Sequence, residues 1–148
     1  MLRHHSPSAL LALRMRLPPL FDMAAFPDQQ RILENEHCVF LVRPERNVLP
    51  GSGLIVPFEP RVSVFDLSTE EWKATFALLH EAKAWIDEHY TPDGYNVGWN
   101  NGRVAGQTIP QVHLHVIPRF ADEPLAGRGI RFHLKQPVNV RPDITRER

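Results

Sequence analysis

The most constraining feature of the sequence is an alternation of residue types from Gln111 to Ile117, which reads Gln-Val-His-Leu-His-Val-Ile. Successive side chains of a β-strand point to opposite faces, so Gln111, His113 and His115 share one face and aliphatic residues occupy the other. We therefore expect a strand over residues 111–118 whose aliphatic face packs into the core. Its other face presents an amide and two imidazoles in one row.

Two imidazoles in such a row allow three interpretations. They can be ordinary surface histidines, or two ligands of one metal ion, because His at positions i and i+2 of a strand can reach the same ion. They can also act on phosphate, with one ring attacking phosphorus and the other donating to an oxygen. No acidic or imidazole residue occurs in the six positions after His115, which weakens the metal interpretation.

The loop before this strand is rich in glycine and in neutral hydrogen-bond donors. Its side-chain amides, hydroxyl and backbone N–H groups can cradle a phosphate without placing a fixed positive charge beside a nucleophile. The residues with these groups are Asn100, Gly106, Gln107 and Thr108. The loop therefore favours phosphate chemistry.

The rest of the pattern predicts an α+β fold with an antiparallel sheet. Apolar runs at 38–42 and 53–57 read as strands joined by a Pro- and Gly-rich connection, and 95–99 reads as another strand. Ser68 begins a capping-box sequence that precedes a helix ending before Thr91. The strands come in adjacent pairs around one main helix rather than in a βαβ series, which favours an antiparallel arrangement.

Aromatic residues recur with helical spacing in this helix, and we expect this face to pack into the core. The residues on it are Trp72, Phe76, Leu79, Ala82 or Lys83, Ile86 and Tyr90.

Composition excludes several other classes of protein. The 148 residues suit one domain, and 17 Lys and Arg balance 17 Asp and Glu, so nothing predicts binding to nucleic acid or to a membrane surface. The single cysteine, Cys38, cannot form an intramolecular disulfide or a Cys-x-x-Cys zinc site, which favours a reducing, cytoplasmic location. We expect a small-molecule partner.

The chain divides into three regions by composition. In residues 1–22, basic residues flank a short apolar run. We expect this segment to be a leader, either a transit peptide or a dispensable segment. Residues 23–120 hold the main domain. Residues 121–148 form an irregular C-terminal extension.

The segment 100–119 resembles the signature of the histidine triad (HIT) superfamily of nucleotide hydrolases and transferases, in which three histidines alternate with apolar residues on a strand. His113 and His115 match the second and third histidines, and Gln111 replaces the first. The Gly106-Gln107-Thr108 loop also matches. Lesser similarity extends back to about residue 29.

The resemblance implies a HIT-like antiparallel sheet of about five strands with one long and one short helix, and a two-fold homodimer. It implies that His113 attacks the α-phosphorus of a nucleotide and that His115 holds the phosphate. The pocket around that phosphate would be lined by Asn100, Gly106, Gln107 and Thr108. The expected substrates are dinucleoside polyphosphates or nucleoside phosphoramidates, cleaved by hydrolysis or nucleotidyl transfer without a cofactor or metal.

Gln111 departs from this pattern. A glutamine amide cannot change charge near neutral pH, so a proton relay at this position is lost, although the backbone carbonyl could still orient the His113 ring. We expect slower or altered chemistry. A nucleotide-binding module with weak or no catalysis is the alternative, and a His-x-His metalloprotein is the third interpretation.

Three arginines are candidate substrate contacts. Arg43 aligns with the position that holds ribose hydroxyls in the family, with Glu45 or Asn47 as substitutes. The tail resembles that of bacterial diadenosine-polyphosphate hydrolases, and there Arg128 or Arg131 could meet distal phosphates, because guanidinium groups bind them bidentately.

Overall fold

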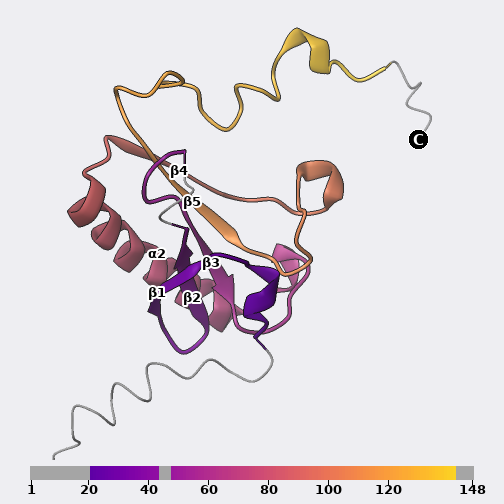
Figure 1. The fold of residues 1–148 in the computed structure, drawn as a ribbon. Helices are drawn as coiled ribbons and strands as arrows, with labels where there is room; N and C mark the ends of the chain where they lie inside the picture. The colour runs from indigo at the N-terminus through magenta and orange to yellow at the C-terminus, as the bar shows by residue number, and fades with distance from the viewer. Residues whose placement is uncertain (1–20, 44–47, 143–148) are drawn as a thin grey trace, which may run out of the picture.

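A five-stranded antiparallel sheet forms the centre of the computed structural model, which describes residues 21–43 and 48–142 (Figure 1). The order across the sheet is β1-β2-β3-β5-β4. The α+β class and the antiparallel sheet are as predicted. The strands are β1 (Gln30–Glu34), β2 (Cys38–Val42), β3 (Gly53–Pro57), β4 (Gly94–Trp99) and β5 (Leu114–Arg119).

The histidine strand β5 begins later than the predicted residue 111. The backbone N–H of Val112 donates to the carbonyl of Arg61, 2.7 Å away, and regular pairing with β3 and β4 starts at Leu114. His113 therefore lies in an extended lead-in to the strand. The alternation itself holds, because Val112, Leu114 and Val116 are buried.

The helix α2 (Thr69–Tyr90) covers one face of the sheet, as Figure 1 shows. It begins at the predicted capping box: the Ser68 hydroxyl accepts from the N–H of Glu71, and the Glu71 carboxylate accepts from the N–H of Ser68. It ends where Thr91 adopts a left-handed conformation. Within the described ranges the other helical segments are three-residue 3-10 turns.

The buried face of α2 matches the predicted face only in part: Ala82 and Ile86 are buried as predicted, whereas two of its aromatic residues are not. Small and aliphatic side chains pack against the sheet, namely Ala74, Leu78, Ala82 and Ile86. Trp72 and Phe76 are 45% and 64% exposed, so their predicted core position is wrong. The small side chains let the helix approach the sheet closely, whereas Trp72 lies at the flank, edge-on to Trp99.

The opposite face of the sheet has its own apolar cluster at one end. The members are Phe26, Val39, Leu41, Val56 and Phe58. The chain before β1, which includes the 3-10 turn η1 (Met23–Ala25), supplies Phe26 and covers this cluster. The same face carries His115 and Ile117, which makes it the face of interest for function.

Two side chains tie the start of the extension after β5 to the sheet. Asp93, just before β4, accepts from the N–H of Ala121 at 2.7 Å, and Arg119 at the end of β5 makes several contacts. Its guanidinium donates to the Asn96 side chain and to the carbonyls of Leu125 and Arg128, and it pairs with Glu123. None of the described helices is long and apolar enough to cross a membrane. Most of the predicted leader, residues 1–20, lies outside the described residues.

Candidate active site

His113 and His115 lie side by side on the face of the sheet opposite α2. Their ring centroids are 4.9 Å apart, with the ring planes at 66°. His115 is paired with Leu54 of β3 and Gly98 of β4. The glycine at that neighbouring position carries no side chain, and Ile130 Cδ1 of the extension lies 3.5 Å from the place that a Cβ would take.

The ring of His113 is held in one orientation. Its Nδ1 lies 2.9 Å from the carbonyl oxygen of Gln111. A carbonyl only accepts, so Nδ1 carries the proton, and in the neutral ring Nε2 then carries the lone pair. Phe26 packs edge-on against the ring, with centroids 5.7 Å apart. The expected contact between the Gln111 carbonyl and His113 is therefore present, and it leaves Nε2 as a potential nucleophile.

The side chain of Gln111 has a role that sequence reasoning missed. Its Nε2 donates to the carbonyls of Pro57 and Glu59, each 2.8 Å away. A neutral amide has two N–H donors on this nitrogen, whereas a neutral imidazole has only one donor in all. Gln111 therefore clamps the lead-in of β5 to the chain that leaves β3, without needing a charge.

The chain from Pro57 to Val64 also supports the donor loop, residues 100–108. Gln107 donates to the Val62 carbonyl at 2.8 Å and accepts from the N–H of Gly102 at 2.8 Å. Asn101 accepts from the N–H of Val64 at 2.8 Å. Gln107 was predicted to contact phosphate. Its side chain is buried, and its amide joins the loop to the chain at Val62. The role of Asn101 was not predicted.

This supporting chain is in turn anchored to the start of α2. The guanidinium of Arg61 donates to the buried Glu71 carboxylate, with Nε 3.0 Å from Oε1. The backbone carbonyl of Arg61 holds Val112, the residue before His113. The position of His113 is thus linked to the helix N-terminus through Arg61.

The other predicted phosphate-binding residues lie on the open part of the donor loop. Trp99 pairs with Leu114, so Asn100 directly follows the last pair of β4 with β5, and His113 directly precedes it. The Asn100 amide lies 3.4 Å from the place a Cβ on Gly106 would take, and Gly106 has a φ of 95°. A side chain there would be strained and would crowd Asn100. Thr108 is exposed.

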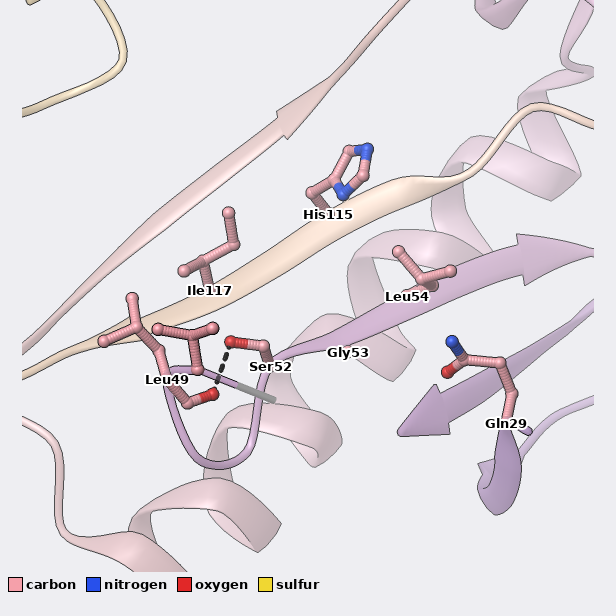
Figure 2. Close-up of a pocket in the computed structure, with 8 residues that line it drawn as sticks. Gln29, Leu49, Ser52, Gly53, Leu54, His115 and Ile117 are labelled. Atoms are coloured by element: carbon pink, nitrogen blue, oxygen red, sulfur yellow. Dashed lines mark hydrogen bonds between the residues drawn. The ribbon is translucent and has the colours of Figure 1, made fainter. Parts of the chain in front are cut away.

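A pocket of about 340 Å³ opens beside His115, and we call it the His115 pocket (Figure 2). Leu54, His115 and Ile117 project from neighbouring strands toward the same side, as Figure 2 shows. The Ser52 hydroxyl donates to the Leu49 carbonyl at 2.7 Å and fixes the turn that forms one wall. The full lining is Gln29, Val48, Leu49, Ser52, Gly53, Leu54, His115 and Ile117.

The family model of the HIT domain matches residues 27–122. The chain belongs to the HIT family. A bis(5'-adenosyl)-triphosphatase of Dictyostelium discoideum is 36% identical over 72 residues, which are 49% of this chain and 48% of that protein. A bis(5'-nucleosyl)-tetraphosphatase (asymmetrical) of Schizosaccharomyces pombe is 33% identical over 72 residues, 49% of this chain and 40% of that protein. The chain thus spans about half or less of the length of these curated relatives.

Solved structures of HIT proteins share the fold. A HIT family protein from Bacillus anthracis superposes with a TM-score of 0.58 at 30% identity, covering 64% of this chain and 66% of that one. A member of the family from Bacillus subtilis gives 0.59 at 26% identity, covering 68% and 72%. The HIT signature strand is the β5 lead-in and strand described above, with Gln111 in the place of the first histidine.

Within this HIT site the pKa of His115 is lowered from its ordinary value. Burial is the main cause, and the neighbouring His113 adds a smaller effect. His115 is therefore neutral near pH 7, and a neutral imidazole donates one hydrogen bond.

The three arginines predicted to contact substrate lie as follows. Arg43 donates to the carbonyl of Pro27 at 3.0 Å. Arg128 stacks on the Phe132 ring, 4.5 Å from its centroid. Arg131 is exposed in the extension. Within the described residues, no hydrogen bond, ion pair or ring contact joins any of the three to His113 or His115, and Glu45 and Asn47 lie outside those residues.

In the part of the chain that the structure describes, no three His, Cys, Asp or Glu side chains come together as a metal site would require. The two active-site imidazoles have no third ligand of these types beside them there.

Proposed function

We propose that this chain is a hydrolase of dinucleoside polyphosphates that works through a covalent nucleotidyl intermediate on His113. The observation that carries the proposal is the hydrogen bond between His113 Nδ1 and the Gln111 carbonyl, which turns the other ring nitrogen away from that bond, next to His115 and the pocket that His115 lines. The activities in the names of the two relatives support the same chemistry.

The reaction has two steps. In the first, the lone pair of His113 Nε2 forms a bond to the α-phosphorus, and the bond from phosphorus to the bridging oxygen breaks, so that the leaving nucleotide departs with the electron pair. In the second, water attacks the same phosphorus, the N–P bond breaks, and a nucleoside monophosphate is released. The Gln111 carbonyl, which accepts the hydrogen bond from Nδ1–H, stabilises the positive charge that develops on the ring.

The nucleoside of the transferred group occupies the His115 pocket. Leu54 and Ile117 offer apolar contacts for a base, and the pocket is close in volume to the lower end of the range for ligand sites, about 300–1,000 Å³. His115 donates to a phosphate oxygen, and Asn100 and the open backbone of the donor loop supply further donors. Gln107 acts as the support of that loop.

The chief alternative is a nucleotide-binding module with weak or no catalysis, which the replacement at position 111 favours. The carbonyl that orients His113 belongs to the backbone, however, so this part of the machinery does not depend on the side chain. Nucleoside phosphoramidates and acceptors other than water are further candidate substrates for the same chemistry.

We also infer a cytoplasmic homodimer joined at the edge strand β4. Apolar side chains are exposed on β4 and on α2: Val97, Trp72 and Phe76 are 38%, 45% and 64% exposed, and Trp72 packs edge-on against Trp99 of β4. Exposed apolar patches mark interfaces. A Val97→Asp variant that remains dimeric in sedimentation would contradict this interface. We also propose that the chain divides into a leader (1–22), a HIT-like domain (23–120) and a C-terminal extension (121–148).

The experiment that tests the function is a substrate panel on wild type and Gln111→His. Diadenosine triphosphate, diadenosine tetraphosphate and an adenosine phosphoramidate are incubated with each protein, and the products are separated by chromatography. The proposal expects release of adenosine monophosphate by wild type. Binding of all three without product supports the module, and stoichiometric zinc or iron in the purified protein supports the metalloprotein.

A further inference from the structure

A second pocket, the Phe58 pocket, lies at the other end of the histidine row. It has a volume of about 240 Å³, and Gln111 forms part of its lining. Gln111 precedes His113 by two residues, just as His115, in the first pocket, follows it by two. The described residues therefore place a pocket on each side of the nucleophile along the same strand.

The walls of the Phe58 pocket suit a flat apolar group. Phe21 and Phe58 meet edge to face, with centroids 5.6 Å apart, and Val62 and Ile109 complete the apolar lining. Its volume is below the about 300–1,000 Å³ that is usual for drug-sized ligands. It therefore suits a single ring system rather than a whole nucleotide.

The charges around the Phe58 pocket disfavour phosphate. None of the described residues that line it is Lys or Arg, whereas Asp22 contributes a carboxylate, which accepts from the N–H of Ala24 at 2.9 Å. An anionic phosphate would be repelled there, and a neutral aromatic ring would not. The charges thus favour a base in the Phe58 pocket and the phosphates at the two histidines.

Gln111 gives this pocket one directed polar group. Its Nε2 is committed to the carbonyls of Pro57 and Glu59. Its Oε1 accepts no hydrogen bond from the described residues, so it can accept one from the exocyclic amine of a base. An apolar pocket with a few polar groups is the usual form of a site that fixes the orientation of a ring, and here Gln111 and Asp22 supply them.

We propose that the Phe58 pocket binds the base of the leaving nucleotide and so makes the site selective for substrates with two nucleosides. This inference rests on the proposed function. It assigns one base to each pocket, with the polyphosphate crossing the histidine pair between them. It also gives Gln111 a contact with substrate in addition to its clamp.

The test compares two substrates that share the transferred nucleotide. Diadenosine triphosphate has an aromatic base in its leaving group, whereas an adenosine phosphoramidate of an alkylamine has none. The variant Val62→Trp fills the Phe58 pocket from a position that is 60% exposed, so it should fold. Ile109→Ala removes a wall, and Val138→Trp, at a 92% exposed valine in the extension, is the matched control.

Val62→Trp should lower kcat/KM for diadenosine triphosphate about tenfold, the size of effect that loss of one base–aromatic contact produces. Its activity on the phosphoramidate should stay within about twofold of wild type, Ile109→Ala should show the same selectivity to a smaller degree, and Val138→Trp should change neither. Equal losses on both substrates, or no loss on either, would overturn the inference while the proposed function stood. A wild type inactive on both substrates would overturn the two together.

Discussion

Replacing Gln111 by Leu removes the clamp between the β5 lead-in and the chain after β3 while keeping nearly the same side-chain size. The two hydrogen bonds to the Pro57 and Glu59 carbonyls are lost. The backbone carbonyl of the same residue orients the His113 ring through Nδ1. Loss of the side-chain hydrogen bonds frees this carbonyl to move. The substitution should therefore affect both stability and catalysis.

The expected loss of stability follows from the number of bonds. Each hydrogen bond contributes a net of about 0.5–1.5 kcal/mol, so two of them contribute about 2 kcal/mol. For a domain of this size that loss lowers Tm by roughly 10 °C. A small displacement of the His113 ring should lower kcat by about a hundredfold, as misplacement by about 1 Å can do.

The assay combines urea unfolding with steady-state hydrolysis of diadenosine triphosphate at a temperature where the variant is folded. Gln30→Leu is the control, because Gln30 is an exposed glutamine on the edge strand β1 and lines neither of the two pockets. Its free energy of unfolding should change by less than about 0.5 kcal/mol. If Gln111→Leu matched Gln30→Leu in both stability and kcat, the clamp would have no role.

The nearly isosteric Gln111→Glu adds a dependence on pH. The introduced carboxylate faces two carbonyl oxygens, which disfavour its charged form and raise its pKa above the unfolded value of about 4.3. The protonated carboxyl can still donate to one carbonyl. Its stabilising contribution is present below the unfolded pKa and is lost as pH rises through the raised folded pKa. The stability gap to wild type should therefore be wider at pH 7.5 than at pH 5.

Three further predictions concern residues around the site. Arg119→Ala should speed hydrogen exchange of the amides at 121–128 and leave that of β2 unchanged, because Arg119 holds the start of the extension; equal exchange in both proteins would refute this. Burial raises the pKa of the Cys38 thiol to about 12, so a thiol reagent at pH 8 should label it only after unfolding. The pKa of His115 is lowered by burial, so an NMR titration should give a midpoint below that of an exposed histidine. The contribution of His115 to stability is complete above the unfolded pKa of about 6.5 and is lost as pH falls through the folded pKa.

Local patterns predicted much of the fold. The runs at 38–42 and 53–57 coincide with β2 and β3, and the helix begins after the predicted capping box. These features depend on neighbours in sequence: alternation, a continuous apolar run, or a hydroxyl three residues from a carboxylate. The edge strand β1 has no such pattern, and its register with β2 shifts between Arg31 and Leu33.

The errors have long-range causes. Two helical stripes compete on α2, one aromatic and one of small residues, and only the distance of the helix from the sheet decides between them. Gln107 and Gln111 donate to carbonyls 45 and 54 residues away in the chain. A local sequence pattern does not reveal such partners, so sequence reasoning missed the backbone support that these two side chains provide.

The most direct test of the account is to identify the residue that carries the nucleotidyl group during turnover of diadenosine triphosphate. The reaction is quenched within the first turnovers under alkaline conditions that preserve an N–P bond, and the peptides are examined by mass spectrometry. We predict one adenylyl group on the peptide that contains His113, attached to that histidine, and neither adduct nor turnover in a folded His113→Ala variant. An adduct on another residue, or full turnover by that variant, would contradict the account.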